Sequence, residues 1–186
     1  MDRPNTPPAS PGIRTGLMAP ADLGAYKSLR DESLRLHPDA FDNDIESEHA
    51  RPPEGYLGRL GLSEPLGGTF LMAAWDGRQL AGVVGLERQS LRKLRHSAEL
   101  GGLVVHPDCR GKGVGDLLMK ACIQEASRAV GLEQITLRVT SSSTAAIRLY
   151  ERAGFQPCGV IPHVVKLIDR AGQVSYFDKL CMVLIL

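Results

Sequence analysis

Two apolar runs near the middle of the chain have the residue types of β-strands. TFLMAAW (69–75) and QLAGVVGLERQ (79–89) flank the dipeptide Asp76-Gly77. Asp-Gly is the strongest short signal for a hairpin, because the favoured two-residue turn needs positive φ at both central positions. The pattern predicts two antiparallel strands.

The other strands and helices follow from the same kind of pattern. Runs of β-compatible residues predict strands at 12–18, 97–105, 134–140, 155–161 and 175–186. Apolar residues at helical spacing predict helices at 21–36, 45–60, from the glycines at 111–115 to near Gly131, and at 143–154. Pro52 and Pro53 leave the bounds of the second helix open. This order predicts an α/β fold, a mixed sheet of about seven strands with helices on both faces.

Length and charge narrow the class of protein. A chain of 186 residues suits one domain, which we place at 13–186. Residues 1–12 hold four prolines and no apolar segment, so we expect a disordered lead-in, no signal peptide or membrane anchor, and a cytoplasmic protein. The net charge of +1 favours neither nucleic acid nor a membrane as partner. Four scattered cysteines predict neither a disulfide nor a metal site.

Three alternating glycines separate the strand at 97–105 from the helix that follows it. Without a Cβ, Gly111, Gly113 and Gly115 allow positive φ and a close approach of a ligand to the backbone. The backbone N–H groups and the positive end of the following helix then point to one place, where Arg110 and Lys112 add charge. The stretch predicts a site for a phosphate-like anion.

Two common phosphate loops do not fit this stretch. A P-loop needs Gly-Lys followed by Ser or Thr, whereas Lys112 is followed by Gly113. A dinucleotide fingerprint counted from Gly111 places Asp116 where its third glycine belongs. A nucleotide-binding protein is therefore disfavoured.

The remaining pattern, RxxGxG at Arg110, Gly113 and Gly115, resembles the pyrophosphate loop of the GCN5-related N-acetyltransferases (GNAT), which bind acetyl-CoA. SSSTAAIRLYERAGF (141–155) resembles the second signature of that family, Asn-x-x-Ala-x-x-Leu-Tyr-x-x-x-Gly-Phe. The resemblance runs from Glu99 to Phe155 and, in strand order, over nearly the whole chain. Ser143 departs from it by standing where the family has asparagine.

The resemblance implies a sheet that splays at the strand ending near Val105, with the pantetheine arm of acetyl-CoA in the opening. The backbone of Leu103 and Val105 would bond that arm, and the Leu103 N–H would polarise the acetyl carbonyl. Asp116 is unhelpful near a pyrophosphate unless it points away. The cofactor residues that the resemblance implies are Leu103, Val104, Val105, Arg110, Gly111, Lys112, Gly113, Val114, Gly115, Asp116, Ser143 and Ala146.

Acetyl transfer to an amine also needs a proton acceptor, because an alkylammonium with a pKa of about 10 is almost fully protonated at pH 7. Glu99 matches the general base of histone-type family members, and regular strand alternation would place it on the same face as Leu103 and Val105. Tyr150 matches the tyrosine that protonates the leaving thiolate. The alternatives are a solvated strand residue for Glu99 and a core aromatic residue for Tyr150.

Other candidates have plainer interpretations. Cys109 and His106 fit packing and a turn better than a nucleophile and a base. The acidic residues between the two leading helices either attract a cationic amine or form a solvated loop; they are Asp39, Asp42, Asp44, Glu46 and Glu48. The segment 163–179 resembles the last hairpin of the family, and its candidate acceptor contacts are His163, Tyr176 and Asp178.

Together these features predict an enzyme that moves acetyl from acetyl-CoA to a primary amine by direct transfer in a ternary complex. A small-molecule acceptor is favoured over a peptide. The alternatives are a non-catalytic acyl-CoA sensor and a protein N-terminal or lysine acetyltransferase. The acceptor itself cannot be read from the sequence, which also leaves a homodimer open.

Overall fold

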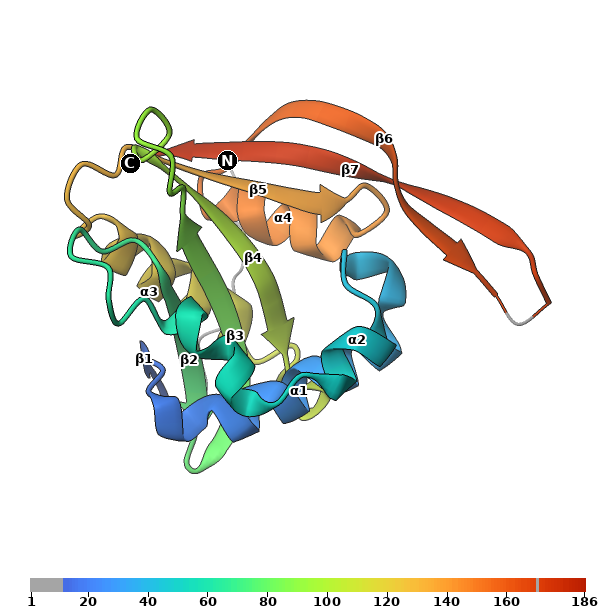
Figure 1. The fold of residues 1–186 in the computed structure, drawn as a ribbon, viewed down its shortest axis with the longest axis horizontal. Helices are drawn as coiled ribbons and strands as arrows, with labels where there is room; N and C mark the ends of the chain where they lie inside the picture. Colours follow the sequence, from blue (N-terminus) through green and yellow to red (C-terminus); the bar gives the residue numbers. More distant parts are fainter. Residues whose placement is uncertain (1–11, 170) are drawn as a thin grey trace, which may run out of the picture.

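The computed structural model describes residues 12–169 and 171–186, so the predicted lead-in lies outside it except for Gly12. In the described residues a seven-stranded sheet has the order β1-β2-β3-β4-β5-β7-β6 (Figure 1). β4 and β5 are parallel, and all other neighbours are antiparallel. The predicted mixed sheet is thus confirmed. The strands are β1 (Ile13–Leu17), β2 (Phe70–Asp76), β3 (Gln79–Arg88), β4 (Ser97–Val105), β5 (Gln134–Thr140), β6 (Gln156–Ile168) and β7 (Val174–Ile185).

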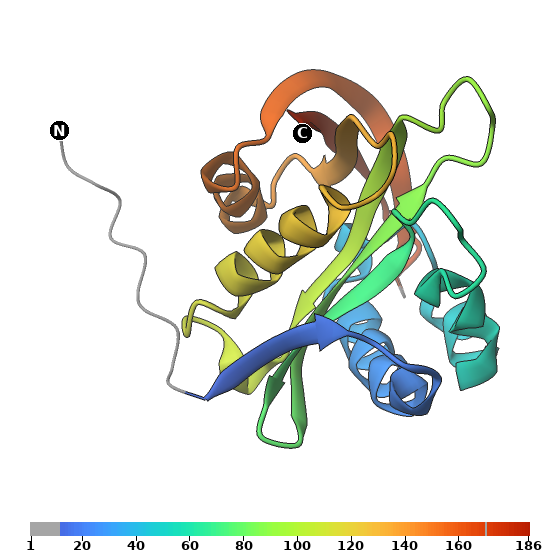
Figure 2. The same ribbon diagram turned by 90° about the vertical axis from the view of Figure 1, so that its left-hand side faces the viewer.

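Helices cover both faces of this sheet (Figure 2), as predicted. Helices α3 and α4 lie on one face and α1 and α2 on the other. The α-helices are α1 (Leu23–Leu36), α2 (Ile45–Ala50), α3 (Val114–Ala126) and α4 (Thr144–Arg152). In the described residues no helix is long and apolar enough to cross a membrane.

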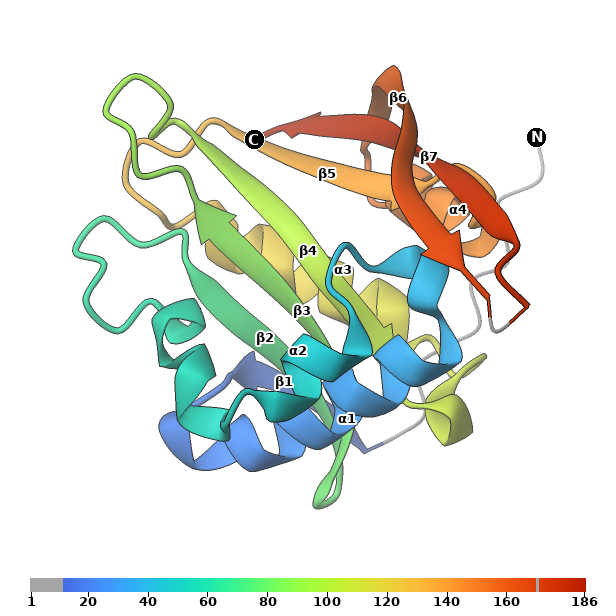
Figure 3. The same ribbon diagram turned by 45° about the vertical axis from the view of Figure 1, so that its right-hand side comes forward.

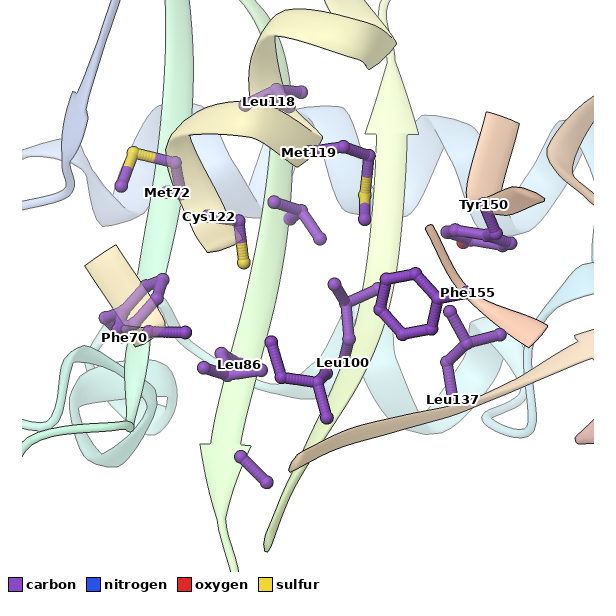
Figure 4. Packing of buried hydrophobic residues seen from close by; sticks show 14 of the residues in the cluster. Phe70, Met72, Leu86, Leu100, Leu118, Met119, Cys122, Leu137, Tyr150 and Phe155 are labelled. Carbon is purple, nitrogen blue, oxygen red and sulfur yellow. The ribbon is translucent and has the colours of Figure 1, made fainter. Parts of the chain in front are cut away.

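The core between α3 and the sheet fixes the position of the glycine loop. Leu118, Met119 and Cys122 of α3 are fully buried over Leu86 and other residues of the central strands (Figure 4). A second cluster, around Tyr26 of α1, packs on the opposite face. Because α3 is held on one face by buried side chains, its first turn is fixed relative to the end of β4.

Two of the predicted helices are wrong in extent. The segment predicted as one helix over 45–60 contains α2 and then a 3-10 helix, η3 (Pro53–Leu60), because Pro52 and Pro53 interrupt the hydrogen-bond ladder. Helix α3 ends at Ala126, before Gly131, and the Val130 N–H donates to the Leu66 carbonyl oxygen instead of continuing the helix.

The β6–β7 ribbon extends beyond the body of the sheet (Figure 3). β6 is longer than the strand predicted over 155–161, because it continues into the segment predicted as the last hairpin. Within this ribbon the rings of His163 and Tyr176 stack at 4.9 Å, and the His163 N–H donates to the Asp178 carboxylate. Of the three predicted acceptor contacts, Tyr176 and Asp178 therefore both contact His163.

Candidate active site

The sheet opens between β4 and β5. The two strands pair only from Ser97 opposite Gln134 to Leu100 opposite Leu137. Beyond that point β4 continues to Val105 and β5 to Thr140 without pairing, and Figure 1 shows the strands diverging. The predicted splay is confirmed, and the backbone groups on the facing edge of β4 have no strand partner there.

A β-bulge in β4 sets the direction of those backbone groups. Two residues, Gly102 and Leu103, lie opposite Val84 of β3, because Gly101 pairs with Gly85 and Val104 with Val83. Gly102 has φ +64°, a conformation that glycine adopts without strain.

The hydrogen bond that follows the bulge shows which backbone N–H groups of β4 face β3 and which face the gap. The His106 N–H donates to the Ala81 carbonyl oxygen of β3 at 2.9 Å. By strand alternation, the N–H groups of Leu103 and Val105 point away from β3 and toward the gap. The backbone of both residues thus has the direction that the resemblance implies.

The same bulge makes one expectation wrong. Glu99 does not share a face with the side chains of Leu103 and Val105, because the extra residue reverses the alternation between them. Leu103 and Val105 pack on the cluster under α3, whereas Glu99 lines a cavity on the face that α1 and α2 cover.

The glycine loop leads into α3 as predicted. Gly111 and Gly113 have φ +72° and +75°, and Gly113 is the N-cap residue of α3. A Cβ at Gly111 would meet nothing within 4 Å, so a ligand can approach the backbone there. Gly115 has a different role, since a Cβ on it would lie 3.0 Å from the Leu149 side chain of α4. The buried side chain of Val114 leaves only its backbone for a ligand.

The charged residues of the loop are directed in different ways. Arg110 donates to the Val105 carbonyl oxygen at 3.4 Å and lies 3.0 Å from the His37 ring, while Lys112 is exposed. The carboxylate of Asp116 accepts hydrogen bonds of 3.0–3.2 Å from Arg152. Its charge is therefore neutralised by α4, which removes the objection to an acidic residue in the loop.

Helix α4 places the second signature beside the gap. Ser143 is the N-cap residue of α4, but its hydroxyl makes no capping hydrogen bond. Its hydroxyl and the half-buried Ala146 are thus available to a ligand.

Tyr150 lies at the edge of the core. Its ring is 8% exposed and meets Phe155 edge-to-face (Figure 4). Burial raises the pKa of Tyr150 far above its usual range, and the neighbouring Cys122 raises it further. The phenol therefore stays protonated at neutral pH, a state in which it can donate a proton.

A cavity of about 710 Å³ lies under α1, α2 and η3. Its floor is formed by β3 and β4, and includes Gly101, Gly102, Glu87 and Glu99. Glu87 and Glu99 are directly opposite in the β3–β4 register. The Glu99 carboxylate accepts a hydrogen bond from Arg138 at 3.2 Å and its side chain is 40% exposed.

Two carboxylates of the acidic segment, Asp42 and Glu48, lie in the cavity wall, and both are paired with cations. Glu48 is buried and paired with Arg30; burial opposes its ionisation, yet the hydrogen bond and charge of Arg30 outweigh this and lower its pKa. Asp42 pairs with Arg138 and Lys179. Both carboxylates are thus paired with cations of the protein, Glu48 in the core and Asp42 with about half of its side chain exposed.

Four cations of this cavity were not predicted from the sequence. They are Arg30, Arg59, Arg138 and Lys179, which come from four separate elements and form no local motif.

The plainer interpretations of Cys109 and His106 agree with the structure. Cys109 is buried in the core, and His106 accepts a hydrogen bond from the Asp108 N–H within a turn. Among the described residues no group of His, Cys, Asp or Glu side chains is placed to hold a metal ion.

Comparison with known proteins finds a matching family and similar proteins. The model of the acetyltransferase (GNAT) family matches residues 26–155. A mycothiol acetyltransferase from Acidimicrobium ferrooxidans is 29% identical over 178 residues, which are 94% of this chain and 52% of that protein. The chain thus spans about half the length of that relative.

Two further comparisons agree. An L-methionine sulfoximine/L-methionine sulfone acetyltransferase from Pseudomonas paraeruginosa is 42% identical over 74 residues, 40% of this chain and 42% of that protein. A GNAT superfamily phosphinothricin acetyltransferase from Sinorhizobium meliloti, solved in complex with acetyl-CoA, has a TM-score of 0.77 at 19% identity, over 94% of this chain and 88% of that chain. At that identity the structural likeness shows the fold.

Proposed function

Because the chain belongs to the GNAT acetyltransferase family, we propose that it moves an acetyl group from acetyl-CoA to the nitrogen of a small primary amine. One observation carries the proposal. The β4–β5 gap and the cavity under α1 and α2 meet at the bulge formed by Gly102 and Leu103. Acetyl-CoA in the gap and the amine in the cavity would therefore meet at this bulge, each approaching it from a different face of the sheet.

The residues around the gap fit acetyl-CoA. The free edge of β4 offers the backbone of Leu103 and Val105 to an amide-bearing arm, as an added strand would use it. The loop from Arg110 to Asp116 offers backbone N–H groups at the start of a 13-residue helix, where an anion is stabilised. When bound, acetyl-CoA supplies the activated acyl group as a thioester.

The protein's own residues then handle charge and protons. The Leu103 N–H donates to the thioester carbonyl oxygen, where negative charge develops. Glu99 accepts the proton of the acceptor ammonium, directly or through a water molecule, so that the nitrogen lone pair can attack. The new C–N bond forms as the C–S bond breaks, and Tyr150 donates a proton to the leaving sulfur. The second proton that the nitrogen loses passes to water, and Tyr150 takes a proton back from solvent.

Replacing Tyr150 tests the last of these roles. Tyr150→Phe keeps the ring in the core, so we expect the midpoint of thermal unfolding to change by no more than a few degrees. Loss of the donor should lower kcat by roughly 10- to 100-fold with little change in acetyl-CoA affinity. Steady-state kinetics and a binding titration measure both. An unchanged kcat would leave Tyr150 as a core aromatic residue.

The proposed function is tested by incubating the protein with acetyl-CoA and a panel of small primary amines. We expect release of free thiol that depends on the amine and equals the acetylated amine found by mass spectrometry. Binding of acetyl-CoA without acetylation of any amine or peptide would instead support a sensor. Acetylation of peptides alone would overturn the small-molecule acceptor.

A further inference from the structure

We propose that the acceptor carries a carboxylate next to its amine, as in an α-amino acid, and that Arg59 of η3 binds that carboxylate. This inference rests on the proposed function and specifies its substrate class. It is carried by the position of Arg59 in the cavity and by the partners that this side chain lacks.

Arg59 lies directly over the glycine floor at the bulge. A Cβ built on Gly85 would lie 2.7 Å from Nη2 of Arg59, and one built on Gly102 would lie 3.7 Å from it. The guanidinium is therefore held against the backbone where the acceptor must meet the acetyl group. The glycines leave room for it and for a small ligand beside it.

The guanidinium of Arg59 has little to bind within the protein. It donates one hydrogen bond, from Nη1 to the Tyr26 hydroxyl, and its Cζ lies over the Tyr26 ring at 5.9 Å from the centroid. In the part of the chain that the structure describes, it has no carboxylate partner, and its other N–H groups have no acceptor. A half-buried guanidinium with several free donors is suited to a planar anion that accepts two parallel hydrogen bonds.

The other cations of the cavity are already engaged. Arg30 and Arg51 pair with Glu48, and Arg138 pairs with Asp42 and Glu99. Arg88 donates to four backbone carbonyl oxygens, and Lys179 to two oxygens besides Asp42. Among the described cations of the cavity, Arg59 is thus the one without a carboxylate or backbone carbonyl partner, although Nη1 of Arg30 also has no acceptor and lies 3.5 Å from a Cβ built on Gly102.

Two carboxylates, whose charge is opposite to that of Arg59, lie near the glycine floor on the same face of the sheet. Glu87 and Glu99 are two residues from Gly85 and Gly101 on their strands, a distance of about 7 Å. In an α-amino acid the ammonium and the carboxylate oxygens are about 3 Å apart. A molecule on the glycine floor therefore places its ammonium toward the two carboxylates while its carboxylate reaches Arg59. This orientation also brings the amine to Glu99, its proton acceptor in the proposed function.

The substrate class is tested with matched compounds. Each of the L-α-amino acids is compared with its primary amide, which keeps the amine and removes the negative charge. The amine of the amide is less basic than that of the acid, so a larger fraction of the amide is the reactive free amine at neutral pH. A higher rate for the acid therefore cannot be an effect of amine protonation. We expect kcat/KM to be about 10- to 100-fold higher for the acid of the preferred pair, since a charge-assisted contact is lost in the amide.

A variant then assigns the effect to Arg59. Arg59→Gln should lower kcat/KM for the acid by about 10- to 100-fold, mainly through KM, and change that for the amide by less than about threefold. Arg59→Lys should recover part of the loss, because it keeps the charge but not the planar fork. Arg128→Gln, which removes an arginine paired with Glu125 on the surface of α3, is the matched control. An unchanged rise in the unfolding midpoint with acetyl-CoA shows that each variant is folded.

The outcomes separate this inference from the proposed function. Equal rates for acids and amides, or equal losses for both in Arg59→Gln, would overturn the carboxylate site and leave the acetyltransferase function standing. Acetylation of neither acids, amides nor any other amine would overturn the proposed function itself.

Discussion

Glu99→Gln is expected to lower kcat/KM by about 10²- to 10⁴-fold at pH 7, the range that general-base catalysis contributes. The carboxylate lines the acceptor cavity, and in the proposed mechanism it takes the proton of the ammonium. The glutamine is nearly isosteric but cannot accept that proton. The remaining rate should rise about tenfold per pH unit below the amine's pKa, because only the free amine then reacts.

Folding and acetyl-CoA binding should hardly change in this variant. The pair of Glu99 with Arg138 is about 40% exposed on both sides, so its loss costs less than about 1 kcal/mol. Glu125→Gln, on the surface of α3, is the matched control for charge removal and should behave as the parent protein. If Glu99→Gln kept its rate within about threefold, Glu99 would be a solvated strand residue and the base would lie elsewhere.

Gly102→Ala should separate the bulge's role in catalysis from its role in folding. With φ +64°, an added Cβ strains the backbone by about 1–2 kcal/mol. A Cβ there would have no neighbour closer than 3.5 Å, so the strain is not compounded by a clash. Relief of this strain tilts the Leu103 N–H away from the carbonyl oxygen, and loss of such a donor lowers kcat by about 10²- to 10³-fold.

Gly77→Ala is the matched control. Gly77 has φ +58° in the β2–β3 turn, and a Cβ there meets nothing within 4 Å. Both variants should lose similar stability, measured as a fall of a few degrees in the unfolding midpoint. The kcat of Gly77→Ala should stay within about twofold of the parent protein. A similar kcat in both variants would mean that the bulge does not position the acetyl group.

The fold was predictable where the sequence pattern is local. The hairpin predicted from Asp76-Gly77, its two strands and the glycine loop depend on residues close in sequence, and they are found, although the turn residues are Gly77 and Arg78 because Asp76 pairs with Gln79. The bulge has a local signal too, since adjacent Gly101 and Gly102 inside a strand favour one. Regular alternation was assumed there, and this assumption placed Glu99 on the wrong face.

The acceptor cavity could not be predicted in the same way. Its walls come from α1, η3, β5 and β7, and the side chains that meet there are far apart in sequence. Arg59 is 43 residues from Gly102, the floor residue over which it lies. No periodicity or short motif records such a contact, because it arises only when the helices pack on the sheet.

The most direct test of the central claim is a thermal melt with acetyl-CoA, with ATP and NAD as controls. A ligand at about 100 times its Kd adds roughly 2.7 kcal/mol, which should raise the unfolding midpoint by about 5–10 °C for a chain of this length. We predict this rise with acetyl-CoA and no comparable rise with the controls. No rise at about 1 mM acetyl-CoA, or an equal rise with ATP, would contradict the assignment of the β4–β5 gap and the glycine loop to acetyl-CoA.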